Sequence, residues 1–338
     1  MNTIKISSQI RYWDQNPTRR ISATDRNGRT IEVAYFPLAQ FTGYSKHYPL
    51  PLLYSYKNKK LFLPLREKFM SLDRGTVYEV GDMFFEDELP EVQKTVDIPM
   101  FYFVYNMANY YHFIYDTLPY LFSYFNEKRI HPDMKLLVSP PEGQDDLYPF
   151  VWDSLNMLGI TRDDVVFLDP EVMYNRVCVS SSLTHNGLSN CPPHRGVFDI
   201  LNSMKSDYVG PEKIYISRRT WVHNKKDNIG TDYTERRRCV NEDQVAQIFK
   251  LYGFQEIFCE NLTMEEKIGM FRTAKYIAGP IGGGMCNTIF SPPDTKVMSI
   301  NSPTFMDVNL RFAYSMVHTD LFNFEHTEFV DKQEESVE

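Results

Sequence analysis

Several patterns that define a class of protein are scarce or missing in this chain of 338 residues. It contains five cysteines, an odd number, and none forms a C-x-x-C pair, so the sequence indicates neither a disulfide framework nor a structural zinc site. No segment carries about 18 uninterrupted apolar residues, so we expect no membrane span. The first residues lack the apolar run of a signal peptide, which favours a cytoplasmic protein.

Acidic residues also outnumber basic residues, 44 to 36. The formal net charge is −8, which argues against a protein that coats nucleic acid or anionic membrane, so we expect neither as a partner. Apolar residues, by contrast, make up 43% of the chain, and aromatic residues 14%. That composition supplies packed cores, and it also suits clefts that stack against sugar rings or bases.

A chain of this length usually folds around more than one hydrophobic core, so we expect two domains, residues 1–206 and 207–338. Short extended segments among proline, glycine and asparagine predict a β-rich start up to about residue 100. A strand, helix, strand pattern over residues 135–168 then predicts α/β structure for the rest of the first domain.

The second domain has the clearer pattern. Strands are expected at 213–217, 255–259, 275–278 and 296–300, and helices that begin at Asn241 and Thr263 alternate with them. Both helix starts have capping-box spacing, with Gln244 and Glu266 three residues further on. The alternation predicts a parallel sheet, hence an α/β fold class. A last helix, over 307–322, is expected to pack back on the first domain.

A glycine-rich turn follows the third of these strands, at residues 279–287. Gly282, Gly283 and Gly284 let the backbone approach a ligand, and the N–H groups of the turn, with Met285 and Asn287 after it, favour negative charge. Ligands of parallel sheets bind at this edge. The run is neither a Walker A motif nor G-x-G-x-x-G, and a tight turn without a ligand is the alternative.

Arginines accompany the turn. Arg218 and Arg219 directly follow the strand at 213–217, at the same sheet edge, and Arg237 belongs to a basic cluster just before Asn241 and Glu242. Guanidinium groups match phosphate oxygens with paired hydrogen bonds. Any one of them could be a solvated surface residue, but together with the glycines they favour a diphosphate site.

His112 and Asp116 are the candidates for proton transfer. They stand four residues apart in an aromatic and apolar segment that we interpret as a buried helix over 109–126, so they share one face. A histidine beside a carboxylate is a plausible general base. A buried histidine held by hydrogen bonds is the alternative.

Metal ligands have little support in the sequence. Glu86, Asp87 and Glu88 form an acidic run, which an acidic surface turn explains better than a metal site does. His185, Cys191 and His194 fall in one loop-like segment without zinc spacing. We therefore expect no metal site and no cofactor.

Three blocks stand in an order and spacing that belong together: residues 109–116, residues 213–219 with 236–242, and residues 278–293. In combination they resemble glycosyltransferase family 61, which includes plant xylan xylosyl- and arabinosyltransferases, animal O-linked GlcNAc transferases and capsular-polysaccharide enzymes. The resemblance covers roughly residues 105–300 and is firmest from residue 213 on.

The resemblance implies a GT-B-like fold, in which two Rossmann-like domains face each other across a cleft. It implies inverting, metal-independent transfer of a sugar such as xylose or GlcNAc from a nucleotide-sugar, with UDP as the expected nucleotide, to a hydroxyl of a glycan or glycoprotein. By the same resemblance, His112 and Asp116 serve acceptor-side catalysis, Arg218 binds the donor diphosphate, and Asn241 and Glu242 match the family's Asn-Glu helix start.

Two positions depart from the family pattern. Ile281 stands where the family's His-Gly-Ala-Gly-Leu motif begins with histidine, and Ser299 stands where the following strand carries a glutamate. Both departures leave open a protein that binds a nucleotide or a sugar without catalysis. A metal-dependent GT-A transferase that uses the acidic run at 86–88 is the other alternative.

Overall fold

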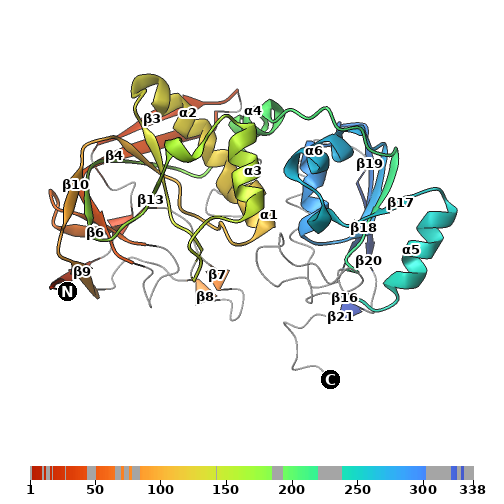
Figure 1. Ribbon diagram of the computed structural model, residues 1–338, viewed down its shortest axis with the longest axis horizontal. Coiled ribbons are helices and arrows are strands. Elements are labelled where there is room, and N and C mark those ends of the chain that lie inside the picture. Colours follow the sequence, from red (N-terminus) through yellow and green to blue (C-terminus); the bar gives the residue numbers. More distant parts are fainter. Residues whose placement is uncertain are drawn as a thin grey trace.

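The chain has an α/β fold in which two sheets are flanked by helices (Figure 1). The computed structural model describes residues 2–9, 11–12, 16, 18–26, 28–43, 51–64, 70–71, 76–77, 84–141, 143–184, 193–219, 238–301, 321–325 and 329–330. The predicted α/β class is therefore confirmed.

The strands before residue 200 are β1 (Thr3–Gln9), β2 (Arg11–Tyr12), β3 (Arg19–Thr24), β4 (Thr30–Phe41), β5 (Leu53–Ser55), β6 (Lys60–Leu63), β7 (Met70–Ser71), β8 (Thr76–Val77), β9 (Phe84–Pro90), β10 (Lys94–Val96), β11 (Met100–Tyr102), β12 (Lys135–Val138), β13 (Val165–Phe167) and β14 (Val172–Ser180). The later strands are β15 (Lys213–Ile216), β16 (Arg238–Cys239), β17 (Gln255–Ile257), β18 (Tyr276–Pro280), β19 (Lys296–Asn301), β20 (Leu321–Glu325) and β21 (Phe329–Val330).

The helices are α1 (Tyr110–His112), α2 (Leu121–Ile130), α3 (Pro149–Met157), α4 (Gly196–Ser203), α5 (Glu242–Leu251) and α6 (Met264–Thr273). A π-helical turn, η2 (Phe113–Thr117), and the 3-10 turn η3 (Leu118–Tyr120) connect α1 to α2. Further 3-10 segments are η4 (Arg162–Asp164), η7 (Cys259–Asn261) and η8 (Gly283–Phe290).

The first sheet combines a parallel and an antiparallel part. Its strands run in the order β13-β12-β11-β14-β4-β5-β6-β2, with β10 beside β14 and β3 beside β4. Pairing is parallel from β13 to β14 and becomes antiparallel where β14 meets β4. The predicted β-rich start and the strand, helix, strand unit of β12, α3 and β13 are both confirmed.

The second sheet is parallel throughout its described strands, in the order β17-β15-β18-β19-β20. Alternation along β15 decides what covers each face, because successive side chains point to opposite sides. Ile214 and Ile216 pack with Ile268 and Phe271 of α6, while Tyr215 packs with α5 on the other face. Figure 1 shows α6 on the side of the first sheet and α5 on the outer side.

One sequence prediction for this region needs correction. Asn241 precedes α5 as its N-cap residue, but its side chain makes no capping bond; its Oδ1 accepts from the thiol of Cys239 at 3.4 Å instead. The helix packs on Tyr215 through Ala246 and Phe249, and it leaves Ile248 and Tyr252 exposed. The capping box of Thr263 and Glu266 is present as predicted.

The expected last helix over 307–322 lies mostly outside the described residues, which resume at 321. The predicted C-terminal end of this helix is wrong, because Phe322 lies in β20. The backbone of β20 pairs in parallel with β19, and Phe322 lies opposite Met298. Parallel pairing with β19 gives these residues backbone partners along one side, and a helical turn there would give up that pairing.

The continuous helix predicted over 109–126 is helical throughout but irregular. Pro119 lacks the N–H that an α-helix would use at that position, and the chain passes through a π turn and a 3-10 turn before α2 begins. Its buried aromatic side chains join the largest apolar cluster, which also contains residues of β15, α6 and η8. The helical segment therefore shares one apolar core with elements of both sheets.

A buried carboxylate ties the first sheet to α2. Glu127 is 0% exposed, and both of its oxygens accept from Nη2 of Arg20, at 2.7 and 2.5 Å. Ser22 and the hydroxyl of Tyr35 donate to it at 3.1 and 2.6 Å. Three side chains from β3 and β4 thus donate hydrogen bonds to the buried Glu127 carboxylate in the C-terminal half of α2.

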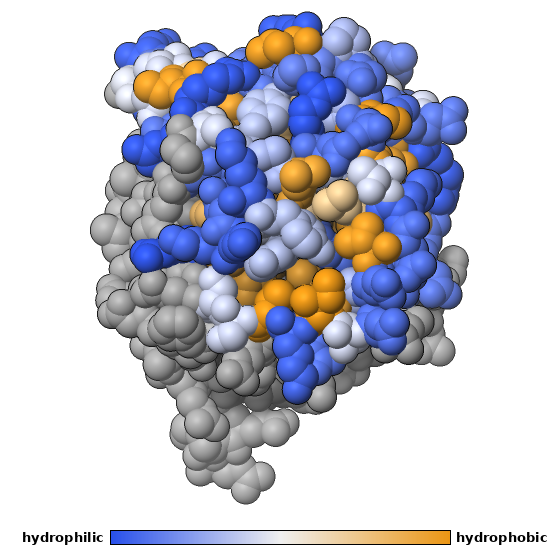
Figure 2. All heavy atoms as spheres, turned by 90° about the vertical axis from the view of Figure 1, so that its left-hand side faces the viewer, coloured by the Kyte–Doolittle hydropathy of each residue, from blue (hydrophilic) through white to orange (hydrophobic). Residues whose placement is uncertain are grey.

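The outer surface of the first half is mostly hydrophilic. Figure 2 views this end of the molecule and shows apolar side chains in small separate groups among polar ones over the described residues. No helix among the described residues is both long and apolar enough to cross a lipid bilayer.

We expect Glu127→Gln to lower the free energy of unfolding by about 1.5–3 kcal/mol, the range for hydrogen bonds to a charged group. Urea denaturation followed by circular dichroism measures this. The matched control is Glu212→Gln, which removes a surface ion pair with Lys275 and should leave the denaturation midpoint unchanged. Equal midpoints for the two variants would contradict the role of Glu127.

Candidate functional site

The site candidates of the second half meet at one edge of the parallel sheet. Strands β15 and β18 are neighbours, and at their carboxyl ends Arg218 and the turn Gly282–Gly284 lie against each other. Nη1 of Arg218 donates to the carbonyl oxygen of Ile281 at 2.8 Å. The sequence prediction that these residues share one sheet edge is therefore confirmed.

Close approach explains two of the three glycines. A Cβ on Gly282 would lie 1.7 Å from Nη1 of Arg218, and a Cβ on Gly284 would lie 2.8 Å from Cγ2 of the buried Ile216. A Cβ on Gly283 would make only an ordinary van der Waals contact, with the Tyr110 ring at 3.9 Å. Glycine at 282 is thus the residue that lets the arginine side chain lie along the turn.

Glu242 lies beneath this edge, at the start of α5. It is 1% exposed, and its Oε1 accepts from the backbone N–H of Arg218 at 2.7 Å and from the hydroxyls of Tyr215 and Ser217 at 3.3 and 3.4 Å. Its Oε2 has no hydrogen-bond partner among the described residues. Burial raises the pKa of this carboxyl, while the N–H and charge of Arg218 lower it.

The remaining predicted donor residues have different surroundings. The guanidinium of Arg219 is held by both oxygens of Glu256, at 2.8 and 2.7 Å, and by Asp243. Met285 is buried beside the turn, and Asn241 lies at the head of α5. Arg237 lies outside the described residues.

His112 and Asp116 face each other as their spacing predicts. Nδ1 of His112 lies 2.6 Å from Oδ2 of Asp116, and Oδ1 of the carboxylate accepts from the hydroxyl of Thr184 at 3.3 Å. Asp116 is fully buried, whereas one third of the His112 side chain is exposed. Because a carboxylate accepts, we place the proton on Nδ1, and Nε2 is left as the basic nitrogen.

One hydrogen bond joins the two sets of residues. The hydroxyl of Tyr110, two residues before His112, donates to Oδ1 of Asn287 at 2.5 Å. Asn287 is fully buried, and its Nδ2 donates to the carbonyl of Gly284 at 2.9 Å. The histidine segment is thereby attached to the glycine turn, and both amide groups of Asn287 are engaged within the protein.

A buried lysine, which the sequence interpretation missed, lies behind this junction. Lys267 of α6 is 2% exposed, and its Nζ lies 4.6 Å from the centre of the Tyr110 ring. Among the described residues its ammonium has no hydrogen-bond or ion-pair partner, although Asp153 and Glu260 are within electrostatic range. Burial lowers its pKa. In the sequence, the neighbouring Glu265 and Glu266 made this position look like a solvated helix face.

Tyr110 was also missed as an individual residue. It lies in the block 109–116, and a tyrosine in such an aromatic run is expected to be a core residue. Its ring does pack on Phe150, and only the position of Asn287, 177 residues away, gives its hydroxyl a role.

The two departures from the family pattern have structural counterparts. The side chain of Ile281 is fully buried, and only its backbone takes part in the turn, donating to Ile300 and accepting from Arg218. Ser299 lies in β19, opposite Gly279 of β18. Neither side chain presents an exposed polar group at the turn.

The metal candidates do not form a site within the described residues. The side chains of Glu86 and Asp87 lie outside them, and the backbone there belongs to β9, paired with β1. His185 and Cys191 are likewise outside, while His194 is buried against Phe122. Over the part of the chain that is described, no three histidine, cysteine or acidic side chains gather as metal ligands.

Comparison with known proteins identifies the family. No curated protein sequence matches the chain. The sequence model of the family described as Glycosyltransferase 61 matches residues 110–298, a stretch that begins at Tyr110 and includes the His112 pair, Arg218 and the glycine turn. This match spans more than half of the chain, so the chain belongs to glycosyltransferase family 61 and is an enzyme that transfers a sugar from a donor to an acceptor.

Proposed function

We propose that the enzyme is an inverting, metal-independent glycosyltransferase that moves a sugar such as xylose or GlcNAc from a nucleotide-sugar to a hydroxyl of a glycan or glycoprotein, with UDP as the nucleotide. The observation that carries this proposal is the junction of Tyr110 and Asn287. It brings a histidine–aspartate pair and a glycine turn, the two halves of a sugar-transfer site, to one place.

His112 is assigned as the general base. Asp116 holds its Nδ1 at 2.6 Å and fixes the ring, so Nε2 is oriented to take the proton of the acceptor hydroxyl. Burial of Asp116 keeps this orientation, and the partial exposure of His112 leaves the ring accessible. Attack by that hydroxyl on the anomeric carbon, in line with the departing nucleotide, inverts the configuration in a single displacement.

The donor diphosphate is assigned to Arg218 and the N–H groups of the glycine turn. The guanidinium is already oriented along the turn by Ile281, and η8 adds backbone donors after Gly282. Arg219 is not assigned, since Glu256 and Asp243 hold its guanidinium. Glu242 is not assigned a direct contact with the donor, since its side chain is buried and its Oε1 instead holds the backbone N–H of Arg218.

The leaving nucleotide gains negative charge during the reaction, and fixed positive groups stabilise such charge most strongly where water is excluded. Arg218 supplies one such group. The buried charge of Lys267, behind Tyr110 and close to Cys259 and Cys286, adds a second positive charge on the protein side of the turn. These charges support transfer without a metal ion.

A GT-B-like arrangement is part of the proposal. In it, residues 1–206 form the acceptor-side domain with His112, and residues 207–338 form the donor domain with the parallel sheet. The contact of α1 with η8 and of α3 with α6 supports a reaction site between the two.

Substitution of the proposed base tests the catalytic role. We expect His112→Ala to lower kcat by about 10²–10⁴-fold, the usual contribution of a general base, with little change in donor KM. Asp116→Asn should act in the same direction because the ring loses its fixed orientation. The assay measures sugar transfer from nucleotide-sugars in EDTA, with the anomeric configuration of the product read by NMR.

His131→Gln is the matched control, since that histidine packs on Tyr35 away from the site. Its kcat should equal that of the wild type. A His112→Ala enzyme with wild-type kcat, or a product with retained configuration, would contradict the assignment.

Substitution of a glycine in the turn tests the donor site. We expect Gly282→Ala to displace the Arg218 guanidinium and to weaken UDP binding by about 10–100-fold, as Arg218→Ala should, since charge-assisted hydrogen bonds are lost. The matched control is Gly43→Ala, at a glycine outside the site where an added Cβ meets no atom within 4 Å, and it should bind UDP as the wild type does. Isothermal titration calorimetry with and without EDTA measures these affinities. Equal affinities for both alanine variants, or binding that EDTA abolishes, would contradict the metal-free donor site.

A further inference from the structure

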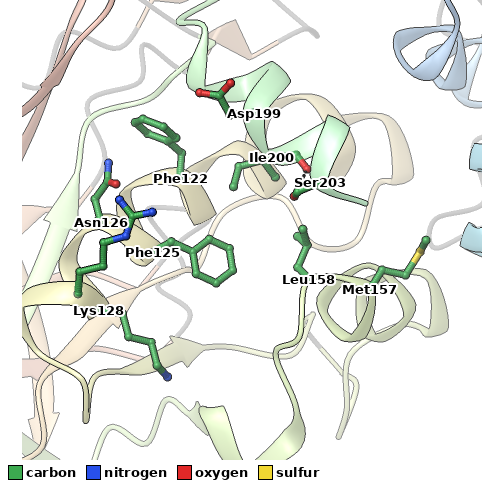
Figure 3. Close-up of a pocket in the computed structure, with 10 residues that line it drawn as sticks. Phe122, Phe125, Asn126, Lys128, Met157, Leu158, Asp199, Ile200 and Ser203 are labelled. Atoms are coloured by element: carbon green, nitrogen blue, oxygen red, sulfur yellow. Dashed lines mark hydrogen bonds between the residues drawn. The ribbon is translucent and has the colours of Figure 1, made fainter. Parts of the chain in front are cut away.

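The first half of the enzyme contains a hollow that is separate from the candidate site. It lies between α2, the end of α3 and α4, and its volume is about 780 Å³. Figure 3 shows Phe122 and Phe125 of α2 opposite Ile200 of α4 and Leu158 at the end of α3. Binding sites for small ligands fall in the range of about 300–1,000 Å³. None of the assigned donor or catalytic residues lines this hollow.

Its aromatic wall is fixed in place. Phe122 and Phe125 are three residues apart and therefore share one face of α2. The ring of Phe122 lies against the first residue of α4, so closely that a Cβ on Gly196 would be 2.6 Å from its Cγ. On another side it packs on the buried His194 ring, at 5.5 Å. A glycine at the start of α4 thus allows this ring to form a rigid part of the wall.

Polar groups stand beside the rings. The side chains of Asn126, Arg129 and Asp199 line the hollow, with Arg129 and Asp199 at its solvent-exposed rim, and none of them makes a side-chain hydrogen bond or ion pair with another described residue. Lys128, by contrast, is engaged with Asp164 and with the hydroxyl of Tyr124, both at 2.8 Å. The unengaged groups therefore include one cation, one anion and one neutral amide.

This balance of charge excludes some ligands. An anionic ligand such as a phosphate would meet Asp199 as well as Arg129, and a lipid chain would make no use of the polar groups that stand beside the rings. A sugar ring has apolar faces, which suit aromatic rings, and an edge of hydroxyl groups, which suits amide, carboxylate and guanidinium groups. We propose that this hollow is a second glycan-binding site, which holds a neutral oligosaccharide part of the acceptor away from the reacting hydroxyl.

The hollow is connected to the reaction site by one continuous helical segment. Phe122 and Asn126 follow His112 by 10 and 14 residues along that segment, which corresponds to about 15–20 Å at a helical rise of 1.5 Å per residue. A monosaccharide is too short to occupy both places. The inference rests on the proposed glycan acceptor, and it does not depend on the assignment of the donor residues.

Direct binding of sugars tests the proposal. The full-length enzyme is titrated by calorimetry with xylohexaose, cellohexaose, mannohexaose and chitohexaose, with the corresponding monosaccharides, and separately with UDP. We expect at least one hexasaccharide to bind, and Asn126→Ala and Asp199→Ala each to weaken it by about tenfold, the loss of roughly one hydrogen bond. Asn202→Ala, an exposed α4 residue outside the lining, should bind as the wild type does.

The outcomes separate this proposal from the donor assignment. UDP binding without binding of any hexasaccharide, or hexasaccharide binding that both alanine variants retain, would overturn the second site and leave the donor site intact. A monosaccharide that binds as tightly as its hexasaccharide would also overturn it, since the site would then hold a free sugar. Hexasaccharide binding without UDP binding would support the second site and count against the donor site.

Discussion

The hydrogen bond from Tyr110 to Asn287 is the interaction on which the account of this enzyme depends. It joins residues that are 177 positions apart in the chain, and its Asn287 end is fully buried. On one side it leads, within two residues, to the proposed base His112. On the other it leads, through Asn287 Nδ2, to the carbonyl of Gly284 in the glycine turn. Asn287 is fully buried, so its amide has no alternative partner in water, and the two segments are held in one relative position.

Buried charge gives this junction its second property. Lys267 and Glu242 are both almost completely inaccessible; the Lys267 ammonium lies over the Tyr110 ring, and Oε2 of Glu242 has no hydrogen-bond partner among the described residues. Such groups cost stability unless something compensates them, and catalytic sites are where that cost is commonly accepted. Because neither side chain is accessible, their effect at this edge of the sheet is electrostatic and does not require contact with a ligand.

The second sheet was predictable from sequence because its signals are local. The alternation of strands with helices, the glycines after β18 and the capping box at Thr263 each act within a few residues, and they predicted the parallel sheet and the location of the turn. The antiparallel pairing of β14 with β4 was not predictable, since it joins segments about 140 residues apart. The same limit applies to Tyr110 and Lys267: a tyrosine in an aromatic run and a lysine beside two glutamates have no local sign of their junction role. Asn241 shows the reverse case, in which a local capping pattern is overridden by a neighbouring thiol.

The most direct test of the account is hydrogen exchange, measured by mass spectrometry, of the wild type and Tyr110→Phe with and without saturating UDP. The account predicts that UDP protects residues 279–290 in both proteins. It also predicts that residues 109–117 gain protection only in the wild type, because the tyrosine hydroxyl transmits donor binding to the histidine segment. Protection confined to 279–290 in the wild type, or the same protection of 109–117 in the variant, would contradict it.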